Sequence, residues 1–224
     1  MTNAKKLLYI SDLDGTLLDE EGRLPADSIK RLNKLIDKGL NFTIATARNY
    51  DSAYPLLKGL NLKHPVILFN GVYLTEFHTG TNLLFSDFIS VDIINKMISI
   101  ADGHNIEPFI YTYGDKHLVY FRRINNLGAQ AYLDIISSEQ RAHKVDSFSF
   151  PISEHISGLL LIDTQEALEP VNAKLKSLYE NELNIYFAPD VSNPEFCWLQ
   201  SFHQEANKGK MLTHMVEHLS IPIS

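Results

Sequence analysis

The sequence predicts an α/β fold in which a Rossmann-like core of parallel strands is interrupted by an inserted α+β domain. Short apolar runs alternate with helical patterns over the first 70 residues, which is typical of a parallel sheet with right-handed crossovers. Hairpin-like pairs of strands dominate the middle of the chain, and a helical pattern returns after residue 206. We therefore expect a core formed by residues 1–80 and 203–224, and an inserted domain over residues 81–202.

The first predicted element is a strand from Leu7 to Ser11, a run so short and apolar that we expect it to be buried on both faces. Asp12 and Asp14 follow it directly. Open α/β sheets bind ligands at the carboxyl ends of their strands, so this strand would deliver two carboxylates to such an edge. Because burying a carboxylate is costly without compensation, a cation, a proton or a set of amide donors should lie beside them.

The rest of the core follows from apolar spacing and from residues that start and stop helices. Pro25 suits the first turn of a helix, and Gly39 suits the end of the same helix. The predicted core elements are a helix over 27–38, a strand over 41–46, a helix over 49–58, a strand over 66–69 and a final amphipathic helix over 208–219.

The inserted domain is predicted as a mixture of antiparallel strands and helices. A hairpin that turns at residues 78–81 leads into it, and a polar segment up to Pro151 follows the helix predicted near residues 128–136. The strand over 73–77 still belongs to the core. The predicted strands of the inserted domain cover 82–89, 108–113, 116–121, 156–162, 184–188 and 195–202, and its predicted helices cover 91–104, 128–136 and 166–179.

Composition narrows the class of protein. Of 224 residues, 45% are hydrophobic and 21% charged, which suits a globular protein with a sizeable core. The net charge is −7 without a long basic run, so we expect no nucleic acid and no membrane among the partners. No apolar run approaches the ~20 residues of a membrane helix, and no signal peptide is recognisable. The single cysteine fits a reducing compartment, so we expect a cytoplasmic location. The oligomeric state stays open.

Four segments together resemble the haloacid dehalogenase-like phosphatase superfamily, and in particular its Cof-like branch. The stretch from Asp12 to Leu17 resembles the first motif, and Thr46 within Ala45-Thr46-Ala47-Arg48 resembles the second. Phe69-Asn70-Gly71 is similar to a segment of the Cof-like branch, and Lys208-Gly209 resembles the third motif. The agreement in order and spacing covers nearly the whole chain.

This resemblance implies a Mg²⁺-dependent phosphatase of small phosphorylated metabolites, such as sugar or cofactor phosphates, whose inserted domain is a cap. Asp12 would be the nucleophile that forms an aspartyl-phosphate, and Asp14 the general acid and base on the same side of an extended backbone. Thr46 and Lys208 would bind phosphoryl oxygens. Mg²⁺ would be held by Asp12 and by the main-chain carbonyl of Asp14. The remaining substrate-binding candidates are Gly15, Thr16, Ala47, Arg48, Asn70 and Gly71.

Each of these residues also has a purely structural interpretation. Asp12 and Asp14 could be turn or helix-capping acids, and Thr46 could only cap the helix that starts near residue 49. Lys208 could be a solvated lysine, and the segment Asn70-Gly71 could be a simple turn.

Alternative functions also stay open. The family has a fourth motif, an acidic pair after a further strand that completes the Mg²⁺ site, and we find no counterpart before Ser224. The main alternative is therefore a truncated, catalytically impaired fragment that at most binds ligand, with its first strand left as an apolar edge. A phospho-acceptor domain that resembles response-regulator receivers and a phosphomutase are further alternatives.

Overall fold

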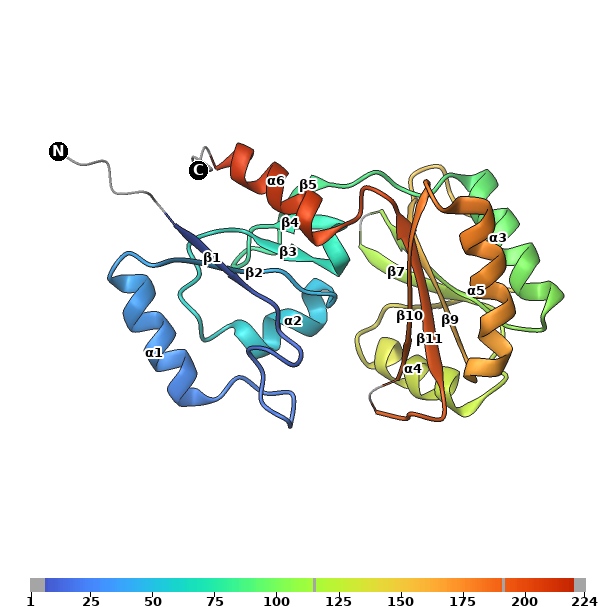
Figure 1. The fold of residues 1–224 in the computed structure, drawn as a ribbon, viewed down its shortest axis with the longest axis horizontal. Coiled ribbons are helices and arrows are strands. Elements are labelled where there is room, and N and C mark those ends of the chain that lie inside the picture. Colours follow the sequence, from blue (N-terminus) through green and yellow to red (C-terminus); the bar gives the residue numbers. More distant parts are fainter. Residues whose placement is uncertain (1–6, 115, 191, 220–224) are drawn as a thin grey trace. The chain divides into compact units, whose positions relative to one another are not determined.

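The computed structural model describes residues 7–114, 116–190 and 192–219. The chain forms two compact units (Figure 1). It passes from the first unit to the second between Ser86 and Asp87, and it returns between Gln204 and Glu205. Within the described residues, no helix is both long and apolar enough to cross a membrane.

The first unit is built around parallel strands. β1 (Leu8–Ser11) pairs in parallel with β2 (Asn41–Ile44), and α1 (Ala26–Asp37) connects them. After α2 (Tyr50–Leu57) comes β3 (Val66–Leu68), which is linked to the end of β2 by a parallel bridge from Ala45 to Ile67. The predicted α/β fold with a parallel-strand core is thereby confirmed.

Two antiparallel strands extend this unit. A single 3₁₀ turn, η1 (Phe69–Gly71), leads from β3 into β4 (Tyr73–Thr75), which pairs with both β3 and β5 (Asn82–Phe85). The expected boundary after residue 80 falls inside the β4–β5 hairpin, and the chain enters the second unit only after Ser86.

The last described helix returns to the first unit. α6 (Lys208–His218) begins at its N-cap Asn207, whose side chain accepts the backbone N–H groups of Gly209 and Lys210. Its apolar face joins a core cluster formed by Ala45, Ile67, Leu74, Met211 and Met215. α6 therefore packs on residues from β3 and β4 although the whole second unit lies between them in the chain.

β1 differs from its expected burial. Leu8 and Ile10 pack against the cluster that contains Met211 and Met215, whereas Tyr9 is 51% exposed. The expectation that this strand is buried on both faces is wrong. Alternate side chains of a strand point to opposite faces, and in the described part of the chain only one face of β1 is covered.

The second unit is a six-stranded sheet in the order β10-β11-β9-β6-β7-β8. α3 (Val91–Gly103) and α5 (Gln165–Tyr179) cover one face, and α4 (Leu127–Ser138) lies on the other (Figure 1). The strands are β6 (Phe109–Tyr113), β7 (His117–Phe121), β8 (Ala142–Lys144), β9 (His155–Asp163), β10 (Leu183–Pro189) and β11 (Cys197–His203). β8 lies in the stretch that was expected to be a polar connection. Its three residues form no recognisable strand pattern by themselves, and they become a strand by pairing with β7.

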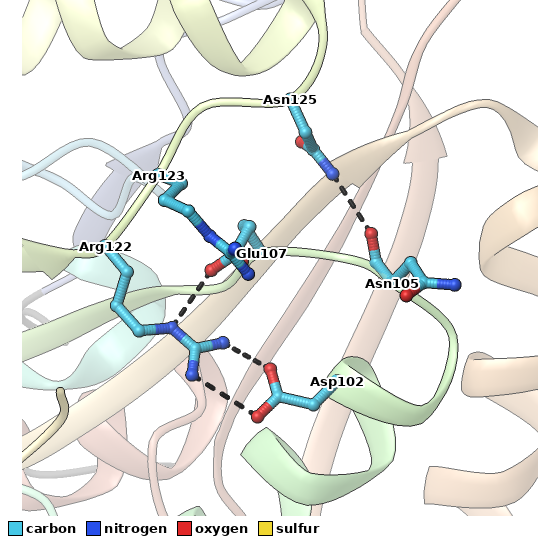
Figure 2. Close-up of polar contacts among 6 residues, drawn as sticks. All are labelled: Asp102, Asn105, Glu107, Arg122, Arg123 and Asn125. Atoms are coloured by element: carbon cyan, nitrogen blue, oxygen red, sulfur yellow. Dashed lines mark hydrogen bonds and ion pairs between the residues drawn. The ribbon is translucent and has the colours of Figure 1, made fainter. Parts of the chain in front are cut away.

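An ion-pair network ties the end of β7 to the end of α3 in this unit (Figure 2). The guanidinium of Arg122 pairs with both carboxylate oxygens of Asp102, and its Nε lies 3.0 Å from Oε2 of Glu107. Arg123 also pairs with Glu107, through an Nε–Oε1 bond of 2.8 Å. Because Glu107 is almost fully buried and meets two guanidinium groups, we interpret this cluster as structural.

Candidate active site

Asp12 lies immediately after β1, and its carboxylate has two donors. Oδ1 accepts the backbone N–H of Leu13 at 2.7 Å, and Oδ2 accepts a hydrogen bond from Nζ of Lys208 at 2.6 Å. Lys208 is the first residue of α6, and only a third of its side chain is exposed. The structural interpretation of Lys208 as a solvated lysine therefore does not hold, because its side chain is paired and mostly covered.

Asp14 has a cationic partner of its own. Arg48 forms a two-pronged ion pair with it, with Nε 3.0 Å from Oδ2 and Nη2 2.7 Å from Oδ1. Between the two acids, Leu13 is fully buried, and its carbonyl accepts the N–H groups of Leu17 and Leu18. The backbone therefore turns here and is not extended as expected. Gly15 and Thr16 lie exposed in the same turn.

The segment after β2 places Thr46 and Arg48. Thr46 is fully buried, and its Oγ1 accepts the backbone N–H of Arg48 at 3.1 Å. Ala47 between them is exposed. Thr46 does not cap α2, because Asn49 does so with a 2.9 Å bond from the N–H of Ser52 to its Oδ1. The capping interpretation of Thr46 is thus wrong.

The turn after β3 holds the Thr46–Arg48 segment in place. The N–H of Phe69 donates to the carbonyl of Arg48 at 2.9 Å, and the N–H of Asn70 donates to that of Thr46 at 3.1 Å. Gly71 follows, with its backbone directly against Asn207 and Lys208. A continuous set of contacts thus links all three strand ends to the start of α6.

The oxygen donors at this edge suit a hard divalent cation. Asp12 and Asp14 offer carboxylate and carbonyl oxygens, and Mg²⁺ is commonly bound by one or two carboxylates while it keeps several waters. Within the described ranges, no group of three or more His, Cys, Asp or Glu side chains gathers to hold a metal. The donor chemistry at this edge therefore fits Mg²⁺ held by few protein ligands.

The role of Asn207 was not predicted from the sequence. Its side chain caps α6 and so orders the turn from which Lys208 extends. An asparagine directly before a lysine-rich helix start is a capping signal that could have identified it.

Comparison with known proteins assigns the family. A family model described as haloacid dehalogenase-like hydrolase matches residues 9–224. The chain belongs to this family. The match confirms the superfamily and the Cof-like branch that the four motifs resemble.

Two curated relatives of this chain are phosphatases. A 5-amino-6-(5-phospho-D-ribitylamino)uracil phosphatase of Bacillus subtilis is 24% identical over 123 residues, which cover 51% of this chain and 46% of the relative. A pyridoxal phosphate phosphatase of Escherichia coli is 33% identical over 109 residues, which cover 49% of this chain and 39% of the relative. The chain thus matches less than half the length of either relative.

Solved structures share the fold over nearly the whole chain. A haloacid dehalogenase-like hydrolase from Bacteroides thetaiotaomicron superposes with a TM-score of 0.73 at 17% identity, over 97% of this chain and 78% of that one. A second, from Bacillus subtilis, gives 0.70 at 19% identity, over 96% and 79%. At this identity the likeness establishes the fold.

Proposed function

We propose that this hydrolase is a Mg²⁺-dependent phosphatase that cleaves monoesters of small phosphorylated metabolites through an aspartyl-phosphate. The observation that carries the proposal is the Asp12 carboxylate, held between the ammonium group of Lys208 and the N–H of Leu13 at the end of a parallel strand. A carboxylate fixed in this way beside a cation is suited to attack a phosphate group that the same cation attracts.

The reaction has two displacements at phosphorus. In the first, an Asp12 oxygen forms a bond to phosphorus while the ester P–O bond breaks, and protonated Asp14 gives its proton to the departing alkoxide. In the second, Asp14 takes a proton from a water molecule that attacks phosphorus, and the bond to Asp12 breaks. Inorganic phosphate leaves, and both acids return to their starting states.

The other residues bind and neutralise the phosphate. Lys208 and the Thr46 hydroxyl meet phosphoryl oxygens, and Arg48 exchanges from Asp14 to the phosphate. Mg²⁺, when held by Asp12 and the Asp14 carbonyl, supplies positive charge to the phosphoryl oxygens. The remaining candidates for contact with the substrate are Gly15, Thr16, Ala47 and Asn70.

Family membership and the relatives' names support the substrate class. The names of the two curated relatives specify small phosphorylated molecules, a phosphoribitylamino-uracil and pyridoxal phosphate. We propose that the second unit acts as the cap that selects among such substrates, and that the protein works in the cytoplasm, consistent with its one buried, free cysteine, Cys197.

Phosphate release by the purified chain tests the proposal. A panel of sugar and cofactor phosphates is assayed with Mg²⁺ and with EDTA, for the wild type, Asp12→Asn and the control Asp27→Asn. Asp27 is a largely exposed carboxylate in the first turn of α1, outside the site. We expect Asp12→Asn to lose at least ~10³-fold in kcat, as removal of a covalent nucleophile does, and Asp27→Asn to match the wild type. Undiminished release by Asp12→Asn would refute the mechanism, and a stable phospho-Asp12 would favour a phospho-acceptor domain.

A further inference from the structure

Three consecutive residues after β3 adopt left-handed backbone conformations. The φ angles are 51° for Phe69, 57° for Asn70 and 93° for Gly71. Glycine tolerates this region and asparagine visits it, but a bulky aromatic residue rarely does. Phe69 is buried, and its ring stacks on Tyr73 with a centroid separation of 5.7 Å. We call the segment Phe69–Gly71 the arch. Strain of this kind persists only where the surroundings over-determine the conformation, and it gathers at functional sites.

The first half of the arch fixes the segment after β2. Phe69 donates its N–H to the carbonyl of Arg48 at 2.9 Å, and Asn70 donates its N–H to the carbonyl of Thr46 at 3.1 Å. Two backbone bonds to residues only two apart leave that segment little freedom. The arch therefore fixes the backbone positions from which the Thr46 and Arg48 side chains extend.

The second half of the arch packs directly against the start of α6. A Cβ atom placed on Gly71 would lie 2.5 Å from the carbonyl carbon and oxygen of Asn207, and 2.8 Å from the backbone nitrogen of Lys208. These are backbone atoms, which cannot swing aside as the end of a flexible side chain can. Only glycine meets both demands at this position, the positive φ and the close approach.

We propose that the arch is a positioning element, which holds Lys208 on one side and Thr46 with Arg48 on the other at the spacing that a phosphate group requires. Gly71 acts through the backbone of α6 and does not touch the substrate, in contrast to the role its motif implied. The significance of that spacing for phosphate rests on the proposed function, whereas the packing of the arch against α6 can be tested without it.

The first test compares Gly71→Ala with Gly39→Ala by amide hydrogen exchange. Gly39 has a φ of 101°, close to that of Gly71, but no atom lies within 4 Å of a Cβ placed on it. Both variants carry the strain of an alanine at positive φ, and only Gly71→Ala carries the collision with α6. We expect faster exchange in the first turn of α6 for Gly71→Ala alone. Equal exchange in both variants would overturn the proposal.

The second test is a double-mutant cycle on the binding of orthovanadate in the presence of Mg²⁺. If Gly71 acts through Lys208, Gly71→Ala weakens binding by roughly tenfold or more, since misplacing a binding group by about 1 Å has effects of this order. The same substitution then adds nothing in the Lys208→Ala background. Additive losses would show that Gly71 acts independently of Lys208 and would contradict the proposal.

If the wild type neither binds orthovanadate nor releases phosphate, the proposed function fails, and the exchange comparison still decides whether the arch seats α6. If Gly71→Ala does not fold, the wild type supplies the test, because orthovanadate should slow exchange of the Phe69 and Asn70 amides when it stabilises the arch. Unchanged exchange at these amides despite bound orthovanadate would overturn the proposal.

Discussion

Nζ of Lys208 lies 2.6 Å from Oδ2 of Asp12, although 196 positions separate the two residues in the sequence. The distance is that of a strong, charge-assisted hydrogen bond. Asp12 comes from the end of the first strand and Lys208 from the first residue of the last described helix. The candidate site therefore exists only once α6 has packed on β3 and β4 within the first unit.

Removal of the Lys208 charge should impair catalysis far more than stability. We expect Lys208→Met to lower kcat/KM for a phosphate monoester by about 10²-fold or more, because a preorganised cation at the reacting phosphate is lost. Lys210→Met is the matched control, since Lys210 lies on the same helix and pairs with Glu205, outside the site. Steady-state kinetics of both variants measure the difference, and equal kinetics would remove Lys208 from the site.

The shape of the Arg48 group should matter as well as its charge. Arg48→Lys keeps the charge but cannot form the two-pronged pair with Asp14 or bind a phosphate in the same way. We expect kcat/KM to fall by roughly tenfold, the loss of one good charge-assisted hydrogen bond. Arg31→Lys, on the exposed surface of α1, should behave as the wild type. A fully active Arg48→Lys would indicate that only the charge is used.

The network in Figure 2 should contribute measurably to the stability of the second unit. Glu107 is almost fully buried, so Glu107→Gln weakens two pairs with arginines in a poorly hydrated place. We expect it to reduce the free energy of unfolding by ~1–3 kcal/mol. Asp102→Asn removes a more exposed partner of Arg122, and we expect a loss below ~1 kcal/mol. Urea unfolding of both variants tests this order, and the reverse order would contradict it.

His117 should make the folded state sensitive to acid. The residue is partly buried, its Nε2 atom is covered by the surrounding protein, and Nδ1 lies 3.1 Å from Nη1 of Arg141. Burial, and secondarily the Arg141 charge, lowers the pKa of His117 to about 3. In the unfolded chain the histidine pKa is about 6.5, so between these values the unfolded state binds a proton that the folded state does not.

The stability that depends on a neutral His117 should therefore be fully present above pH ~6.5. As the pH decreases toward 3, the free energy of unfolding should fall by a few kcal/mol. His117→Gln cannot bind that proton, so its stability should fall less steeply over the same range. Urea unfolding at a series of pH values measures both slopes. Parallel slopes for the wild type and His117→Gln would show that His117 does not control the acid response.

Local patterns were sufficient for most of the secondary structure. Apolar spacing, Pro25 and Gly39 predicted α1 within about a residue at each end, because helix periodicity and end signals are local properties. β8 was missed because Ala142, His143 and Lys144 become a strand only through pairing with β7. Tyr9 was expected to be buried, but the exposure of a strand's second face depends on what packs there, which no local pattern contains.

The sequence by itself determined the family, the order of the core elements and the identity of the candidate residues, because motif spacing and periodicity are written along the chain. The tertiary structure decided how these residues meet. It paired Asp12 with Lys208 and Asp14 with Arg48, and it brought Gly71 against the start of α6. Such contacts join residues that are far apart in sequence, and they depend on backbone approach and side-chain geometry that only the packed chain possesses.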